Sequence, residues 1–61
     1  MNLNNLALLL KDKGDYAGAE PLYRRALAIA EKALGPDHPE TRLIRDNLQQ
    51  ALSRQENGAP N

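Results

Sequence analysis

The sequence contains no cysteine, tryptophan or phenylalanine, and its only aromatic side chains are two tyrosines. The absence of cysteine excludes disulfides and thiolate chemistry, and it fits a reducing compartment. No apolar run approaches the roughly 18 residues that a membrane-spanning helix needs, and no positively charged segment precedes an apolar run as in a secretory signal. We therefore expect a cytoplasmic protein without a membrane anchor.

An excess of charge of one sign is also lacking. Eight basic and eight acidic side chains cancel, and the longest basic cluster is Arg24-Arg25. Proteins that bind nucleic acid present a basic patch or stripe that neutralises phosphates. Because this chain has no such cluster, we expect no nucleic-acid partner.

The reactive side chains form no catalytic or metal-binding pattern. His38 is the only histidine, and the carboxylates near it in the sequence are Asp37 and Glu40, which are too few ligands for a metal site. Neither Ser53 nor Thr41 has a base positioned to activate it as a nucleophile. We therefore expect no enzymatic activity, no cofactor and no metal. His38 is interpreted as a turn residue, and the two carboxylates as capping residues.

Apolar residues recur with the period of an α-helix in three segments. The first segment, about residues 2–13, is followed by Gly14 and by Asp15, which can cap the next helix. The second, residues 16–34, stops at Gly35 and Pro36. The sequence thus predicts an all-α fold with an antiparallel helical hairpin over residues 1–34. A Gly/Pro linker at 35–39, a third helix at 40–54 and a flexible tail at 55–61 follow.

The third segment partly repeats the first. A shift of 42 residues places Asn5 on Asn47 and Leu6 on Leu48, and it places Leu10 on Leu52. The same shift places the small Ala7 on Gln49, and Leu9 on Ala51. We therefore interpret the third helix as a solvating end helix, with no second hairpin after it.

Four stretches carry a resemblance to a known family: Asn4 to Leu10, Gly14-Asp15-Tyr16-Ala17, Ala19 to Leu27, and Leu34-Gly35-Pro36-Asp37-His38-Pro39. Together they resemble the tetratricopeptide repeat, in particular the 42-residue variety of the kinesin light chains. The resemblance implies a helical solenoid unit without catalysis. It also implies that peptides or protein partners bind on the concave face, which the first helix of each repeat lines.

Candidate peptide-binding residues follow from this resemblance. In the family, asparagines on the first helices commonly hydrogen-bond the ligand backbone, and Asn5 and Asn47 occupy matching positions here. Their neighbours on the same side, which could add contacts, are Leu8, Asp12, Gln50 and Arg54. The alternative is that these polar side chains simply face water.

The thin core favours self-association. Nine of the 25 hydrophobic residues are alanines, and repeat units do not bury their apolar face alone. We therefore expect a protein-interaction module that forms a homo-oligomer, preferably a closed dimer, by surface contact or by exchange of the third helix about the linker. The residues proposed for this contact are Leu8, Leu43, Ile44, Leu48 and Leu52. The alternative function is a peptide-binding adaptor, or a fragment of a longer array.

Overall fold

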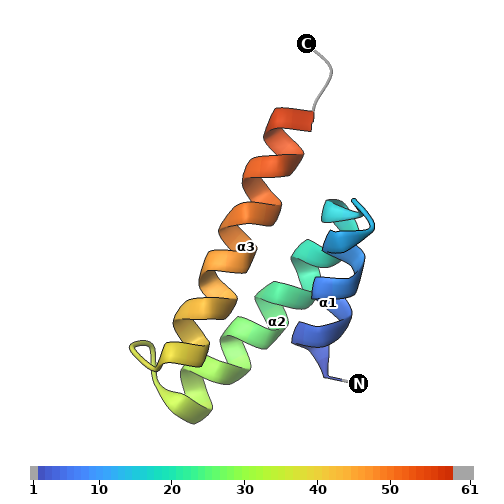
Figure 1. Ribbon diagram of the computed structural model, residues 1–61. Coiled ribbons are helices and arrows are strands. Elements are labelled where there is room, and N and C mark those ends of the chain that lie inside the picture. The colour runs from blue at the N-terminus through green and yellow to red at the C-terminus, as the bar shows by residue number, and fades with distance from the viewer. Residues whose placement is uncertain (1, 59–61) are drawn as a thin grey trace.

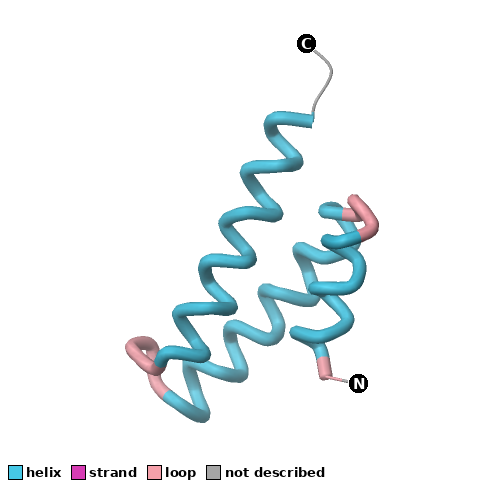
Figure 2. Tube along the Cα trace, in the orientation of Figure 1, coloured by secondary structure: helices cyan, strands magenta, loops and turns pink. Residues whose placement is uncertain are grey.

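The computed structural model describes residues 2–58, and the side chains up to residue 55. This part of the chain forms three helices and no strand, which confirms the all-α fold predicted from the sequence (Figures 1 and 2). The helices are α1 (Leu3–Asp12), α2 (Tyr16–Leu34) and α3 (Pro39–Gly58). α1 and α2 form an antiparallel hairpin, and α3 runs back along α2 with little contact to α1. The central helix α2 therefore holds the molecule together.

The first turns of α1 and α2 are both closed by side chains. The Oδ1 atom of Asn2 accepts the backbone N–H of Asn5 at 2.7 Å, and Oδ1 of Asp15 accepts that of Gly18 at 2.9 Å. These bonds satisfy donors that have no partner within the helix. Gly18 also lies so close to the Asp15 carboxylate that a Cβ atom there would collide with it. Asp15 thus caps α2 as the sequence indicates, and a side chain at position 18 would displace its carboxylate.

The linker between α2 and α3 starts with a backbone conformation that glycine adopts more readily than other residues. Gly35 has φ of 97° and ψ of 156°, and its N–H donates to the carbonyls of Ala30 and Glu31. A side chain would be strained in this backbone conformation. Across the linker, Arg45 of α3 donates from Nη2 to the carbonyl of Pro36 at 3.1 Å. The chain therefore reverses direction within a few residues.

The third helix is longer than the sequence predicted. It continues to Gly58, so the expected flexible tail is wrong for residues 55–58, and residues 59–61 lie outside the described residues. Near this end of the helix, Gln55 makes a contact that is distant in the sequence. The Nε2 atom of Gln55 donates to Oε1 of Glu20 at 2.8 Å and lies 3.5 Å from the carbonyl oxygen of Tyr16. These bonds hold the end of α3 against the start of α2.

Small residues dominate the core, since five of the eight apolar residues that are buried in the described part of the chain are alanines. They let α1 and α3 approach α2 closely, and Tyr23 supplies bulk at the centre. The buried set is Ala7, Ala19, Tyr23, Ala26, Ala30, Ile44, Leu48 and Ala51. Part of the apolar stripe of α2 stays uncovered, because α1 has 10 residues and α2 has 19. Ile29, Ala33 and Leu34, in the second half of α2, are exposed.

Candidate interaction surfaces

A polar depression of about 310 Å³ lies between α1 and α3. Lys11 donates from Nζ to Oε1 of Gln50 at 2.9 Å and so bridges the two helices. The residues that line the depression are Lys11, Asp12, Tyr16, Gln50 and Arg54. Three of the six side chains proposed for peptide binding, Asp12, Gln50 and Arg54, are therefore brought together. Charges of both signs and an amide in one depression can pair with the polar groups of a peptide backbone and its side chains.

The other three residues proposed for peptide binding lie outside this depression. Asn5 is exposed at the start of α1, where its N–H is bonded to Asn2. Leu8 is 39% exposed on α1, and Asn47 is partly buried on α3. Asn5 and Asn47 occupy matching places in the two helices but do not line one common hollow. The depression between α1 and α3 is thus narrower than the surface expected from the sequence.

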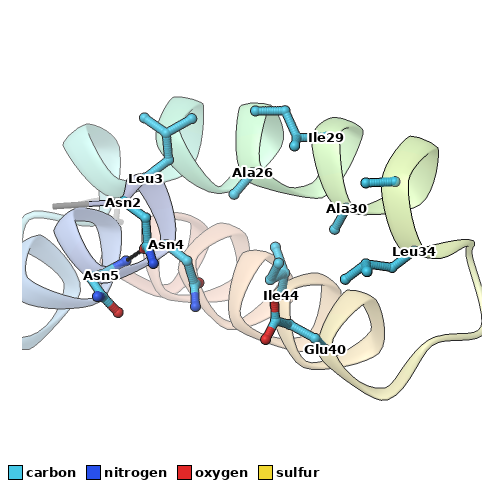
Figure 3. A pocket seen from close by; sticks show the side chains of 11 residues that line it. Asn2, Leu3, Asn4, Asn5, Ala26, Ile29, Ala30, Leu34, Glu40 and Ile44 are labelled. Atoms are coloured by element: carbon cyan, nitrogen blue, oxygen red, sulfur yellow. Dashed lines mark hydrogen bonds between the residues drawn. The ribbon is translucent and has the colours of Figure 1, made fainter.

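A second groove, of about 590 Å³, was not anticipated from the sequence (Figure 3). The first turn of α1 provides one end of it, and the uncovered half of α2 provides an apolar wall. Its lining residues are Asn2, Leu3, Asn4, Asn5, Ala26, Ile29, Ala30, Ala33, Leu34, Glu40 and Ile44. Alanines leave the wall hollow, as Figure 3 shows for Ala26 and Ala30. The Oδ1 atom of Asn4 is buried and has no hydrogen-bond partner among the described residues.

The residues proposed for self-association fall into two groups. Ile44 and Leu48 are 3% and 6% exposed and belong to the chain's own core, and Leu52 packs partly buried against that core. In this fold they do not form an open surface, because α2 already covers them. Leu43 and Leu8, in contrast, are 55% and 39% exposed.

Other large apolar side chains are exposed where the sequence placed them on buried stripes. Leu6 and Leu9 of α1 are 36% and 42% exposed, and Ile29 and Leu34 of α2 are 60% and 44% exposed. Periodicity indicates which residues share a helix face, but it does not say whether another helix covers that face. The 42-residue shift gives a signal that these two leucines belong to a face that a helix can cover. It places Leu6 and Leu9 on positions of α3 that are buried, whereas in α1 both side chains are exposed.

His38 caps α3, a role that sequence reasoning gave to its acidic neighbours. Its carbonyl accepts the N–H of Arg42 at 3.0 Å, and its Nδ1 atom accepts the N–H of Glu40 at 3.1 Å. This is the pattern of an N-cap residue, with imidazole in place of the usual hydroxyl or carboxylate. Among the described residues, no three His, Cys, Asp or Glu side chains gather as a metal site would require.

Two ionisable side chains of α2 have shifted pKa values. Burial raises the pKa of Tyr23, and the nearby charge of Asp12 raises it further. The pKa of Glu20 is lowered by its hydrogen bond from Gln55 and then by that from Arg24, whose Nε atom lies 2.7 Å from Oε2. The hydroxyl of Tyr23 and that of Thr41 are buried without a partner in the described part of the chain. These features stabilise or strain the fold but do not form a catalytic arrangement.

None of the three described helices is long and apolar enough to cross a bilayer. A search of curated proteins and one of solved structures gave no match to the chain. A family model described as tetratricopeptide repeat matches residues 3–40, which is more than half of the chain. The match covers α1, the whole of α2 and the start of α3. Such repeats are in general protein–protein interaction modules and are typically non-catalytic. This chain belongs to the tetratricopeptide repeat family.

Proposed function

We propose that this chain is a non-enzymatic interaction module that binds a second copy of itself through one face of α1. Leu6 and Leu9 lie three positions apart and so share that face, which we name the α1 face. The internal repeat carries the proposal. A shift of 42 residues places Leu6 on Leu48 and Leu9 on Ala51, which are 6% and 0% exposed in the core. The same two positions in α1 are left uncovered.

The small core supports this proposal. Among the side chains described, from residue 2 to 55, eight apolar ones are buried, and only three of these are large: Tyr23, Ile44 and Leu48. A domain of about 60 residues is marginal on its own, and burial of further apolar surface by association is a common remedy. Covering Leu6 and Leu9 in a partner would add two leucines to the buried set.

The opposite end of the molecule favours a closed dimer over a fibre. Arg42 and Gln49 of α3 are exposed, and Gln49 stands where α1 has the buried Ala7. A polar end gives little apolar surface for a head-to-tail contact with the next copy. An isologous contact, in which the same face of both copies meets, closes after two chains.

Sedimentation equilibrium over a concentration series tests the proposal. We expect the wild type to dimerise, and the double variant Leu6→Gln, Leu9→Gln to remain monomeric and helical. The matched control is Ile29→Gln with Leu43→Gln, since these two side chains are even more exposed but lie outside the α1 face. A wild type that stays monomeric and helical at every concentration contradicts self-association. Equal dimerisation of both double variants contradicts the α1 face.

Exchange of α3 between two copies is the other route to a dimer, and a cross-link distinguishes it. Because the chain has no cysteine, Glu20→Cys can be placed in one chain and Gln55→Cys in another. Their parent side chains are in contact at 2.8 Å within one fold. After the two chains are unfolded and refolded together, a disulfide between them forms only if α3 of one chain docks on α2 of the other. Contact through the α1 face alone gives no such disulfide.

The second candidate function is capture of a peptide in the polar depression between α1 and α3. The gathering of Asp12, Gln50 and Arg54 favours it, and the 42-residue period supports a relation to the kinesin light chain variety. Peptides selected on the wild type from a displayed library should lose binding to Asp12→Ala and Arg54→Ala, with helicity unchanged. Asn5→Ala and Asn47→Ala test the wider peptide-binding surface that was expected from the sequence. Leu43→Gln serves as the control. Retention of binding by all four alanine variants contradicts this candidate.

A further inference from the structure

The start of α3 depends on an imidazole nitrogen that has no proton. Nδ1 of His38 accepts the N–H of Glu40 at 3.1 Å, so Nδ1 carries a lone pair and the ring proton lies on Nε2. The same residue accepts the N–H of Arg42 at its carbonyl, 3.0 Å away. We propose that His38 is a proton-sensitive cap, and that its protonation loosens the docking of α3 on α2.

Protonation removes the cap for a geometric reason. An imidazolium ring carries a hydrogen on both nitrogens and has no acceptor. The proton on Nδ1 would point at the N–H of Glu40, so a stabilising contact becomes a repulsive one. The new positive charge would also lie at the N-terminal end of α3, where the helix dipole favours negative charge. Both effects act against the first turn of the helix.

The charged groups around the linker do not cancel this effect. Those on the linker and on the nearest turns of the elements that meet it are Asp37, Glu40, Arg42 and Arg45, with Glu31 and Lys32 of α2. Asp37 and Glu40 are beside His38 in the unfolded chain as well, so their attraction for an imidazolium is present in both states. Glu31 is paired with Arg45 at 3.5 Å. The bond to Nδ1, in contrast, exists only when α3 is formed.

A weak first turn matters because α3 provides much of the core. Thr41 and Ile44 follow directly after the cap, and they are 0% and 3% exposed. Within the linker, the N–H of His38 itself donates to the carbonyl of Gly35 at 3.3 Å. When the first turn frays, these buried side chains lose their place on α2. The inference concerns a single chain and holds whether or not two copies associate.

Thermal unfolding at about pH 8 and about pH 5 tests the cap, because imidazole takes up its proton in this range. His38→Asn keeps a neutral acceptor at both pH values, and His38→Ala has none. At one fixed protein concentration, we expect the Tm of the wild type to fall at the lower pH by about 4–8 °C more than that of His38→Asn. His38→Ala should melt low at both pH values and lack the additional fall. Equal pH dependence in the wild type and either variant would overturn the proposal.

Nuclear magnetic resonance of the wild type gives a test that needs no variant. At about pH 8, the ring nitrogen shifts of His38 should report a neutral ring with its proton on Nε2, and the backbone amide signal of Glu40 should move when the pH is lowered to about 5. The amide of Gly18 is the internal control, because it is capped by the Asp15 carboxylate at 2.9 Å. A Glu40 amide signal that moves no more than that of Gly18 would also overturn the proposal.

Discussion

The side-chain amide of Gln55 donates a hydrogen bond of 2.8 Å to Oε1 of Glu20, which fixes the far end of α3 to the first turns of α2. The other carboxylate oxygen accepts Nε of Arg24 at 2.7 Å. One ionised carboxylate of α2 therefore binds a side chain of α3 that lies 35 positions further along the sequence. Both bonds favour the charged form, so the pKa of Glu20 lies below its ordinary value of 4.5.

Acid should weaken the fold through this carboxylate. A lowered pKa in the folded state means that the stabilisation is present above the ordinary value of 4.5 and is lost as the pH falls through the folded value. We expect the urea midpoint to fall on acidification below about pH 5, and to fall less in Glu20→Gln. Gln55→Ala removes the hydrogen bond that lowers the pKa of Glu20 most, and it should also flatten the curve. Identical curves for the wild type and both variants would contradict this role of Glu20.

Removal of the Tyr23 hydroxyl should stabilise the protein. The side chain is 0% exposed, and its oxygen has no hydrogen-bond partner in the described part of the chain. Because a buried polar group without a partner costs free energy, Tyr23→Phe should raise the free energy of unfolding by about 1 kcal/mol. Tyr23→Ala, which also removes the ring, should lower it by about 3–5 kcal/mol. Urea unfolding measures both changes, and a loss of stability in Tyr23→Phe would show that the hydroxyl is satisfied.

Tyr23 should also ionise late in an alkaline titration. Burial, and then the charge of Asp12, raises its pKa above the ordinary value of 10.0. In a Tyr16→Phe background, tyrosinate absorbance reports Tyr23 alone, and the native midpoint should exceed that of the urea-unfolded chain. The stabilisation from burying the neutral Tyr23 side chain is present below its pKa in the unfolded chain, and it is lost as the pH rises through its pKa in the folded protein. Asp12→Asn should lower the midpoint of the Tyr23 titration only in part, because burial raises the pKa more than the charge of Asp12 does. A midpoint equal to that of the unfolded chain would contradict the larger role of burial.

The cap of α2 should reverse the usual effect of replacing a helical glycine. Gly→Ala within a helix ordinarily stabilises by about 0.5–1 kcal/mol. At Gly18 the new Cβ collides with the Asp15 carboxylate, so Gly18→Ala displaces a cap worth about 0.5–2 kcal/mol. We expect no gain, or a loss of up to about 1 kcal/mol, in urea unfolding. In an Asp15→Ala background the same change should stabilise, and additivity of the two substitutions would refute the coupling.

Local signals in the sequence were enough to predict the three helices. Asp15 and Gly35 mark the ends of α2, and apolar residues recur every three or four positions between them. Capping and backbone preferences of this kind act within a few residues, which is why a single sequence reveals them. The part of α3 beyond residue 54 carries no such local signal, and the contact of Gln55 with Glu20 near that end joins residues 35 positions apart.

The surfaces were harder to predict than the helices. Ile44 and Leu48 form an apolar stripe that the sequence cannot assign to the chain's own core or to a partner, and the structure buries them against α2. Leu6 and Leu9 form an equally regular stripe and are exposed. The difference is that the stripe of α3 faces α2, whereas Leu6 and Leu9 lie on a face of α1 that α2 leaves exposed. Likewise, His38 becomes a cap only because the turn after Gly35 aims its ring at the N–H of Glu40.

Ala7, Ala19 and Ala51 are each 0% exposed along the contacts of α2 with its two neighbours. Alanine side chains suit places where helices pack closely, and a larger side chain there would overpack the contact. A valine or leucine at any of these places would force neighbouring side chains or the helices themselves to shift. The spacing between the helices is therefore a rigid dimension of this hairpin, whereas its outer residues can change without altering its shape.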